Sequence, residues 1–546
     1  MKRLLLLLVS LAPVITYGAD PETEIGQRFL EEERQRLELE ALRREQESLP
    51  SVLDELLPVP EETPCFAIER IEVTGVTLLD DKTLADTVGR YAQKCLGKTG
   101  VNQLMQEITS LYMRAGYITS RTYIPPQDLR SGVLKLTVVE GYVEGVSING
   151  NSASDRRKLW WAMPSKWEEH LRLPAIEQGM DQIGRVRSAT TTMKIWPGEE
   201  PGASHVQIIN ETDNEFRGEI EYNNDGNDDT GRQQFRFGFE GDNIIGINDT
   251  TSLNLITSSN TNALTWAGSF PYRYWTFNLS HSYSEYLSML PGNTDLFGQS
   301  NTSSLVSDYL IYRNGKMKLN TSLAFTVRRS ERYLLGTELE PQKLSPVRWA
   351  TNLSENRRWG FYSIELGYVH GTKLWGATDD PQSLPGGAPH AQFYKVDGRG
   401  TLSVPLPGRV NYLAVLAGQY ADDGLYSSEQ VHIGGRSSVR GTDSTLVSGD
   451  KGYTLQQTFS WPLAMLAQRV GKHFQWLRYI NAQAHFDYGR AISIDGPAGS
   501  ASSIGAGISA RYQRFSTNLG WAHVLRAEEQ YQSQNTAYLS LIVDVF

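Results

Sequence analysis

The C-terminal part of the chain, from Phe216 to Phe546, carries a hydrophobic pattern with a period of two residues. From Phe216 onward, apolar and polar side chains alternate along segments of about ten residues. In 234–240, for example, Phe235, Phe237 and Phe239 alternate with polar residues and one glycine. This pattern suits strands with one face to lipid and one to a polar lumen, although a soluble β-sandwich shows the same alternation. The number and length of the segments, and their continuation to the last residue, favour the membrane. We therefore predict a mixed fold in which 216–546 is an antiparallel transmembrane β-barrel of about sixteen strands.

The last predicted strand, Thr536 to Phe546, leaves its orientation open. Its cleaner apolar face comprises Leu539, Leu541, Val543 and Val545. Phe546 is out of phase with that face. Because successive side chains of a strand point to opposite faces, only one of these two sets can face lipid if the strand is regular throughout.

Between residues 65 and 213 the pattern instead predicts two copies of an α/β unit. Each copy has a strand, two helices and two further strands, and the copies repeat with a period of about 75 residues. In the first, 65–141, we expect strand 66–74, helices 80–91 and 101–115, and strands 118–124 and 133–139. In the second, 142–213, we expect strand 142–148, helices near 155–161 and 175–189, and strands 191–196 and 205–209.

The N-terminal 64 residues divide into three segments. Residues 1–18 have the basic start, apolar core and small-residue exit of a secretory signal, with cleavage expected after Gly18. Residues 20–48 are predicted to form a charged helix with an incomplete apolar stripe, which suits a wet channel, a surface cap or a fully solvated helix. Residues 49–64 are rich in proline and predict an extended linker.

Composition narrows the class of protein. The net charge of −10 argues against a general nucleic-acid binder. The chain has two cysteines, Cys65 and Cys95, and an exported protein meets an oxidising compartment in which they would form a disulfide. Two free buried thiols are the alternative. In the predicted first unit, the bond would join the start of the first strand to the end of the first helix.

One connection within the predicted barrel is unusually long. Most connections span about 4–6 residues, whereas the segment 421–450 runs for roughly thirty. Gly434, Gly435 and Gly441 permit backbone angles that other residues resist, so the segment can fold back on itself. Counting strands in pairs places it between strands eleven and twelve, on the outside. We expect its tip to turn into the pore.

The thirteenth strand offers a partner for this loop. Along 480–489, apolar residues alternate with polar ones, and the alternation points Asp487 into the lumen. Arg440 on an inward loop would meet this carboxylate, and such pairs are often bidentate. Breaking the pair would cost about 3–5 kcal/mol if water is excluded and about 0–1 kcal/mol in a wet lumen. The alternative is an exposed loop arginine and an ordinary lumen carboxylate.

These ordered features resemble one family, the TpsB group of two-partner secretion transporters in the Omp85 superfamily. Its loop motif, Val-Arg-Gly-Tyr, corresponds to Val439, Arg440, Gly441 and Thr442, with threonine in place of the aromatic residue. Its strand motif ends in Phe, Asp and Gly, and Phe486-Asp487-Tyr488-Gly489 is similar. Within the group, the acidic helix and the cysteine pair look like transporters of contact-dependent growth inhibition toxins.

The resemblance implies export of a large exoprotein from periplasm to cell surface. Residues 65–141 and 142–213 would be periplasmic POTRA domains that bind the N-terminal secretion domain of that exoprotein. The helix 20–48 and loop 421–450 would block the resting pore. The barrel would lie as a monomer in the outer-membrane lipid of a Gram-negative bacterium. It would be inserted by the barrel assembly machinery, whose substrates often end in an aromatic residue such as Phe546.

Other functions remain open at this stage. A haemolysin or adhesin transporter and a barrel assembly insertase share parts of the pattern, and a passive porin or a barrel enzyme would belong to a different class. The segment 225–231 has oxygen ligands at alternate positions, but its spacing suits a hairpin turn better than a calcium loop. The sequence has no glycine-rich phosphate loop followed by Lys-Ser/Thr. We predict no catalytic site, cofactor, metal site or bound nucleic acid.

Overall fold

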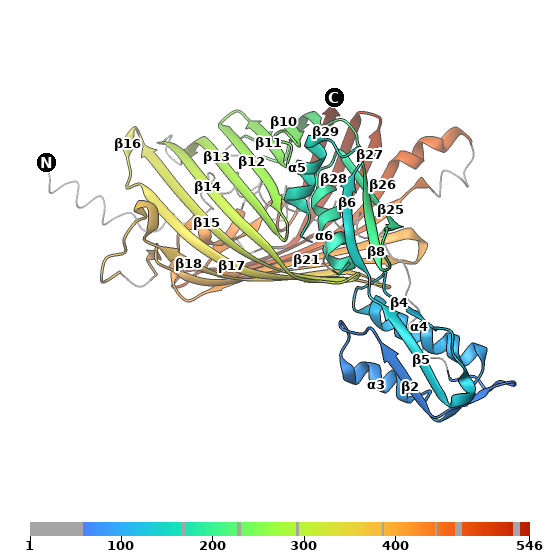
Figure 1. Cartoon of the computed structure of the whole chain (residues 1–546). Helices are drawn as coiled ribbons and strands as arrows, with labels where there is room; N and C mark the ends of the chain where they lie inside the picture. The colour runs from blue at the N-terminus through green and yellow to red at the C-terminus, as the bar shows by residue number, and fades with distance from the viewer. Residues whose placement is uncertain are drawn as a thin grey trace.

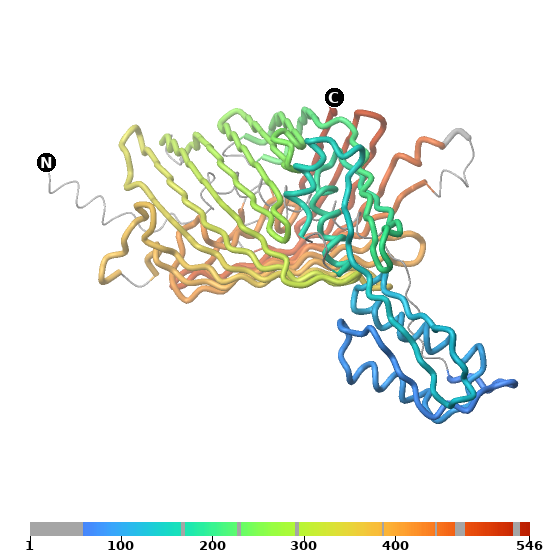
Figure 2. The backbone as a smooth tube through the Cα atoms, in the orientation of Figure 1, coloured from blue at the N-terminus to red at the C-terminus, as the bar shows by residue number. Residues whose placement is uncertain are grey.

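A computed structural model describes most of the chain. It covers residues 58–164, 170–226, 231–290, 294–384, 387–442, 445–464, 472–527 and 535–546. The predicted signal peptide and charged helix, and most of the linker, lie outside these residues. The described chain forms two α/β units and a closed barrel, and the first unit projects from one end of the barrel (Figure 1, Figure 2).

The first unit is a three-stranded sheet covered by two helices. Its sheet has the order β2-β5-β4, with β2 parallel and β4 antiparallel to β5. Leu104, Ile108 and Tyr112 recur every fourth residue on α4, are fully buried, and belong to the same apolar core as Leu134 and Leu136 of β5. The elements are β1 (Phe66–Ile68), β2 (Arg70–Thr74), α3 (Asp81–Gly89), β3 (Lys94–Leu96), α4 (Lys98–Arg114), β4 (Arg121–Tyr123), a 3-10 helix (Leu129–Ser131) and β5 (Val133–Val139).

Two details of the first unit differ from the sequence prediction. The strand expected over 66–74 is divided into β1 and β2, and β1 pairs with β3 instead of joining the main sheet. Cys95 therefore lies in β3 and not at the end of a helix. It is bonded to Cys65, with 5.3 Å between the Cα atoms. The short β1–β3 pairing was missed because β3 has three residues, too few for a periodic signal.

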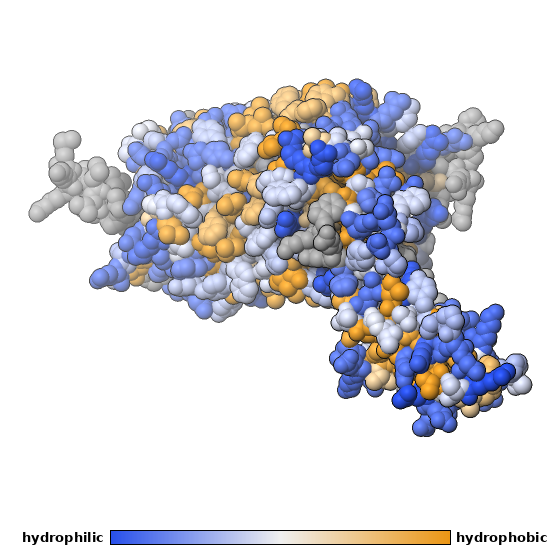
Figure 3. Space-filling view, in the orientation of Figure 1, coloured by the Kyte–Doolittle hydropathy of each residue, from blue (hydrophilic) through white to orange (hydrophobic). Residues whose placement is uncertain are grey.

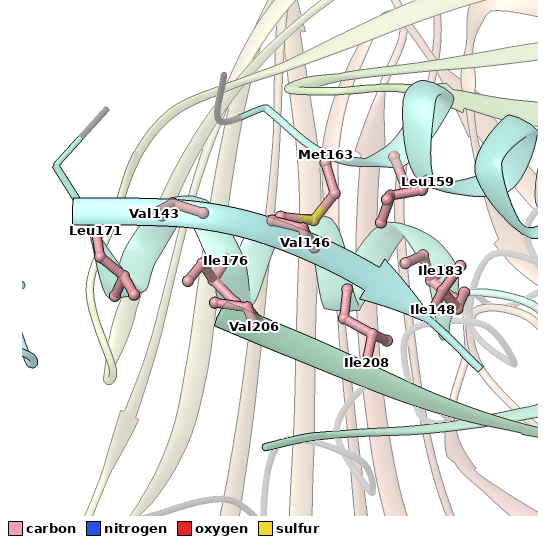
Figure 4. Packing of buried hydrophobic residues seen from close by; sticks show 11 residues of the cluster. Val143, Val146, Ile148, Leu159, Met163, Leu171, Ile176, Ile183, Val206 and Ile208 are labelled. Carbon is pink, nitrogen blue, oxygen red and sulfur yellow. The ribbon is translucent and has the colours of Figure 1, made fainter. Parts of the chain in front are cut away.

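The second unit repeats this topology. Its sheet has the order β6-β8-β7, again with one parallel and one antiparallel pairing. Figure 4 shows side chains from the strands and both helices converging on one apolar core. The elements are β6 (Tyr142–Ile148), α5 (Ala153–Ala162), α6 (Leu173–Ile183), β7 (Ala189–Pro197) and β8 (Ala203–Thr212). None of the helices in the described residues is long and apolar enough to cross a membrane.

The second helix of this unit ends earlier than predicted. We expected it to reach Ala189, but α6 ends at Ile183 and Gly184 follows as its C-terminal cap. The next residues contact the barrel instead: the backbone N–H of Ser188 donates to Asp242 at 2.8 Å. Tertiary contacts therefore override a helical pattern that continues in the sequence.

The barrel is closed and has sixteen long strands, as predicted. Neighbouring strands pair antiparallel, and β29 pairs with β9 to complete the closure. The two-residue β16 (Thr337–Glu338) also pairs with β15. The long strands are β9 (Phe216–Asn223), β10 (Gln234–Asp242), β11 (Thr250–Thr257), β12 (Thr261–Tyr272), β13 (Trp275–Leu290), β14 (Thr294–Arg313), β15 (Met317–Leu334), β17 (Gln342–Arg357), β18 (Gly360–Thr372), β20 (Tyr394–Leu406), β21 (Val410–Ala421), β25 (Lys451–Pro462), β26 (Ile480–Ile492), β27 (Ala498–Tyr512), β28 (Phe515–Arg526) and β29 (Asn535–Asp544).

Alternate residues of the strands face opposite sides of the barrel wall. On β10, Phe235, Phe237 and Phe239 are exposed on the outer face. On the neighbouring β9, Arg217 points inward and pairs with Asp242. Figure 3 shows hydrophobic residues in patches over the barrel wall, between hydrophilic ones. The predicted alternation therefore separates a lipid face from a polar interior.

The structure resolves the orientation of the last strand. The hydroxyl of Ser540 is buried and donates to Glu221 inside the barrel at 2.8 Å, so Leu541 and Val545 face outward. Phe546 lies beyond the end of β29 and no longer follows its alternation. A Cβ on the outward-facing Gly218 would come within 2.9 Å of the Phe546 ring. Both sets therefore reach the outer face, because the regular strand ends before the last two residues.

The second unit docks on the turns at one end of the barrel. Arg313 at the end of β14 donates to Asp181 of α6 at 2.9 Å. Gln182 donates to two backbone carbonyls at the β12–β13 turn, at 3.1 and 3.2 Å. Together with the Ser188–Asp242 contact, these bonds fix the unit at the mouth of the barrel (Figure 1).

Glu140 lies between β5 and β6, where the chain passes from the first unit to the second, and its carboxylate binds three residues of the first unit. Burial opposes its ionisation more than any other single effect, but several donors together hold the pKa of the carboxyl below its usual value. These donors are the Thr77 hydroxyl, the Thr77 N–H at 2.6 Å, the Tyr112 hydroxyl at 2.7 Å and the Leu78 N–H at 2.9 Å. The ionised form therefore stabilises the unit.

We expect Glu140→Gln to lower the free energy of unfolding of the first unit by about 1–2 kcal/mol at neutral pH, since charge-assisted bonds are lost. Because the pKa of Glu140 is lower in the folded protein, its ionised carboxylate stabilises the fold at pH values above the unfolded-state pKa of about 4.3. This contribution is lost as the pH falls through the folded-state pKa. Parent and variant should therefore converge in acid. Urea unfolding of the full-length protein, followed by helical circular dichroism at several pH values, measures this.

Glu72→Gln is the matched control, because Glu72 forms a surface ion pair with Arg70 and such pairs contribute about 0–1 kcal/mol. A difference between parent and Glu140→Gln that persists at the lowest pH would contradict the proposed role of the charge.

Candidate functional site: a loop fastened inside the barrel

The long connection between β21 and β25 enters the barrel interior. These are the eleventh and twelfth long strands, as the sequence predicted. The loop contains β22 (Gly424–Leu425), a 3-10 helix (Ser427–Glu429), and the hairpin strands β23 (Val431–Gly434) and β24 (Thr445–Gly449). β22 also pairs with β19 (Pro389–His390) of the preceding long connection. The hairpin presents its tip to the barrel wall at β26.

Three glycines shape the tip. Gly434, Gly435 and Gly441 have φ of 122°, 77° and 109°, in the region that side-chain-bearing residues rarely adopt. Between them, the Ser438 hydroxyl donates to the Gly434 carbonyl and accepts from its N–H, both at 2.8 Å. The tip is thus held by its own bonds, and Val439 and Arg440 project from it in fixed directions.

Arg440 meets Asp487 of β26 in a bidentate ion pair. Its Nε donates to Oδ2 at 2.7 Å, and its Nη2 donates to Oδ1 at 2.6 Å. The backbone N–H of Arg440 also donates to Oδ2, at 3.1 Å. One carboxylate therefore holds both the side chain and the backbone of the loop. The parallel geometry requires a planar guanidinium, so lysine would not reproduce it.

The ion pair is enclosed by the barrel wall. The side chain of Asp487 is 0% exposed and that of Arg440 is 18% exposed. Arg440 also donates to the hydroxyl of Thr458 on β25 at 3.2 Å, and Ser503 on β27 donates to Asp487 at 3.5 Å. The pair is therefore closer to the case in which water is excluded than to that of an ion pair in a wet lumen. Removing one charge would leave the other buried, at a cost of about 3–5 kcal/mol.

Gly489 provides room for the loop. It is two residues beyond Asp487 and faces the same side of β26. A Cβ at this position would lie 2.9 Å from the Ile433 side chain and 3.1 Å from Val439. Both side chains are fully buried and pack with Ala491 and Ala501. Small residues on the wall thus form a shallow seat for the apolar side of the tip.

Thr442 occupies the position at which the loop motif Val-Arg-Gly-Tyr has tyrosine. Its hydroxyl accepts from the N–H of Gly435 at 2.7 Å, which closes the tip internally. An aromatic ring comes instead from Tyr538 of β29, whose hydroxyl accepts from the Gly441 N–H at 2.7 Å. Thr536 of the same strand donates to the Gly441 carbonyl at 2.8 Å. The last strand therefore anchors both backbone groups of Gly441.

Further ion pairs hold the loop to other parts of the wall. Arg436 pairs with Asp225, just beyond the end of β9, and its guanidinium lies 5.8 Å from the centre of the Tyr538 ring. Glu429 is buried and pairs with Arg328 of β15 at 3.0 Å and with Lys395 of β20 at 2.8 Å. The loop is thus bonded to strands that are far apart around the barrel and crosses its interior between them.

The structure brings together most of the predicted site residues. Arg440, Asp487, Val439 and Gly489 are in contact, and the three glycines and Thr442 shape the tip. Phe486 is the exception, because it points to the outer face and is 39% exposed. The disulfide of Cys65 and Cys95 lies in the first unit, away from this site.

Several site residues were not predicted from the sequence. They are Glu429, Arg436, Thr458, Thr536, Tyr538 and Asp225. Thr458, Thr536 and Tyr538 face inward on their strands. Thr536 and Tyr538 lie on the last strand, so they could have been predicted if the sequence had shown which face of that strand points into the barrel. Within the described ranges, no group of three or more His, Cys, Asp or Glu side chains is arranged to hold a metal ion.

We expect Asp487→Asn to lower the opening free energy of the loop tip by about 3 kcal/mol, because the Arg440 charge stays buried without its counter-charge. Amide hydrogen exchange at 433–442 should then be roughly a hundredfold faster in the full-length protein, since about 1.4 kcal/mol corresponds to a factor of ten.

Asp422→Asn is the matched control. Asp422 begins the same loop and pairs with Lys451, but its side chain is 79% exposed, so its loss should leave exchange at the tip unchanged. Equal exchange in Asp487→Asn and the parent protein would show that the ion pair does not hold the tip.

Comparison with known proteins gives consistent matches along the chain. Residues 202–512 match the family model of the haemolysin secretion/activation protein ShlB/FhaC/HecB. Residues 66–141 match the ShlB-type POTRA domain, and residues 142–197 match a second POTRA model. The structure is similar to that of CdiB from Escherichia coli, with a TM-score of 0.86 and 27% identity over 95% of this chain and 98% of that one.

Two sequence relatives cover most of the chain. The outer membrane transporter CdiB of Dickeya dadantii is 34% identical over 412 residues, which span 73% of each protein. The hemolysin transporter protein ShlB of Serratia marcescens is 30% identical over 491 residues, spanning 85% of this chain and 83% of that protein.

Proposed function

Since the chain belongs to the ShlB/FhaC/HecB family of haemolysin secretion/activation proteins, and so is a two-partner secretion transporter of the outer membrane, we propose that it exports a contact-dependent growth inhibition toxin. The observation that carries this choice of exported protein is the 34% identity to the CdiB of Dickeya dadantii, together with the whole-chain similarity to the CdiB structure from Escherichia coli. The competing candidate is a haemolysin, supported by the relative from Serratia marcescens.

The inward loop is proposed as the element that controls passage. It crosses the lumen from Glu429 to the ion pair of Arg440 and Asp487, so an extended chain entering the barrel would meet it. Hydrogen bonds and ion pairs hold the loop in place, and its tip packs against the wall through a small apolar cluster. A limited number of polar contacts therefore separates the closed arrangement from an open one.

The two POTRA domains are proposed to receive the exoprotein in the periplasm through its N-terminal secretion domain. Each sheet has two outer strands, β2 and β4 in the first and β6 and β7 in the second. Outer strands can bind an extended peptide by adding it to the sheet. Docking of the second domain at the barrel mouth would then deliver the peptide to the lumen. We further propose that the barrel is a monomer and is inserted by the barrel assembly machinery.

Residues 20–48 are proposed as a second obstruction of the resting pore. This segment lies outside the described residues, and the proposal rests on its charged composition, which a wet lumen accepts better than lipid does. The transport itself requires no catalytic group in this scheme, and the energy would come from folding of the exoprotein outside the cell.

For the export proposal, we expect cells that produce this protein to display a contact-dependent inhibition exoprotein on their surface. Arg440→Ala should reduce the protease-accessible exoprotein to roughly a tenth or less, since a loss of about 1.4 kcal/mol already shifts an equilibrium tenfold. The amount of transporter in the outer membrane should stay the same. Surface proteolysis and immunoblotting of both proteins provide the measurement.

Lys451→Ala is the control for loss of a positive charge at this loop, because Lys451 pairs with Asp422, whose side chain is 79% exposed. Export of a haemolysin-type exoprotein but not of the toxin would refute the proposed exported protein while leaving the transporter family intact. Normal export by Arg440→Ala would refute the role of the loop.

Deletion of residues 20–48 should raise the ion conductance of the purified protein in planar bilayers, because an obstruction of the lumen would be removed. The deletion combined with Asp487→Asn should conduct more than either change alone, since two separate obstructions are released. Conductance equal to that of the parent protein would exclude this segment as a plug.

A further inference from the structure

The helix α5 of the second unit rests on the outer face of the barrel and not only on its turns. The centre of the Trp161 ring lies 6.1 Å from the ring centre of Phe270 and 5.7 Å from that of Tyr272. The ring centres of Trp160 and Tyr272 are 5.8 Å apart. Phe270 and Tyr272 continue the side of β12 on which Trp266 is exposed outward. Figure 1 shows α5 beside the ends of β11 and β12. The tryptophan pair therefore extends the lipid-facing wall onto the α/β unit.

A neighbouring turn carries exposed apolar side chains in line with the same face. Ile244 and Ile245, between β10 and β11, are 52% and 64% exposed. Ile244 covers the outer face of Gly241, where an added Cβ would lie 2.7 Å from its Cδ1. Arg157 of α5 donates to the Gly246 carbonyl of this turn at 3.1 Å. Helix and turn are thus joined at the rim of the barrel.

Trp160, Ile244 and Ile245 together form what we name the rim patch. Trp160 is 57% exposed, so all three large apolar side chains face solvent in the absence of a partner. One residue before the tryptophans, α5 carries Arg156, Arg157 and Lys158. Tryptophan beside basic residues is the composition of segments that lie at a membrane interface, where the rings occupy the headgroup level and the cations attract anionic lipid.

We propose that the rim patch binds phospholipid of the periplasmic leaflet and holds the second unit against the membrane. The lipid face of the barrel is already covered by the bilayer, and the patch continues that face at the end where the second unit docks. A phospholipid partner matches both the apolar side chains and the basic run. A partner protein or a second copy would have to compete with the lipid beside it.

Site-directed spin labelling of the full-length protein in liposomes tests this proposal. The chain has two cysteines, and they are bonded to each other, so an introduced cysteine is the one free thiol. Labels are placed by Trp160→Cys and Ile245→Cys. The control is Lys194→Cys, an exposed position on the sheet face of the same unit opposite its helices. Vesicles contain phosphatidylethanolamine with phosphatidylglycerol.

At positions 160 and 245 we expect oxygen, which concentrates in lipid, to relax the label several-fold more effectively than a water-soluble nickel chelate. The control label should show the reverse. The proposal is overturned if either patch label is as accessible to the chelate as the control, or if labels at 160 in dilute vesicles broaden one another and so reveal a second copy. Heat-modifiable migration on gels establishes that each variant retains its folded barrel.

Discussion

The barrel interior is organised around one bidentate contact between Arg440 and Asp487. A loop that enters a polar lumen gains little from hydrophobic burial, so it needs polar contacts of strict geometry to stay there. The guanidinium–carboxylate pair provides such geometry, and the backbone N–H of Arg440 adds a third bond to the same carboxylate. Because the wall excludes water from Asp487, removing either partner costs far more than breaking an ion pair at the surface.

The features around the pair allow these two groups to meet. Positive φ at Gly441 lets the loop turn directly after the arginine, and the missing side chain at Gly489 leaves room for Val439. Tyr538 and Thr536 then bind the backbone of Gly441 from the last strand. Since β29 also pairs with β9 to close the barrel, the loop tip is bonded beside the closing seam. Opening the loop and loosening that seam would affect the same residues.

The periplasmic end shows a different balance of forces. There the second unit is held by hydrogen bonds from α6 and Ser188 to the turns of the barrel and by aromatic contacts of α5 with its outer face. The first unit is closed by Glu140, where the chain passes from β5 to β6. A chain arriving from the periplasm would thus meet the second unit, which is bonded to the mouth of the barrel, and, inside, a loop held by a few polar bonds.

The sequence by itself determined the elements whose pattern is local or periodic. Alternation with a period of two is enough to predict sixteen strands and the inward direction of Asp487, because the side chains of a regular strand must alternate. The repeated α/β pattern predicted both small units, because helices and strands have different hydrophobic periods and the same order of elements occurs twice. The tertiary structure decided what depends on distant partners: the β1–β3 pairing at the disulfide, the early end of α6, and the anchors Glu429, Arg436 and Tyr538. Such contacts join residues far apart in the chain, and only the closure of the barrel brings them within bonding distance.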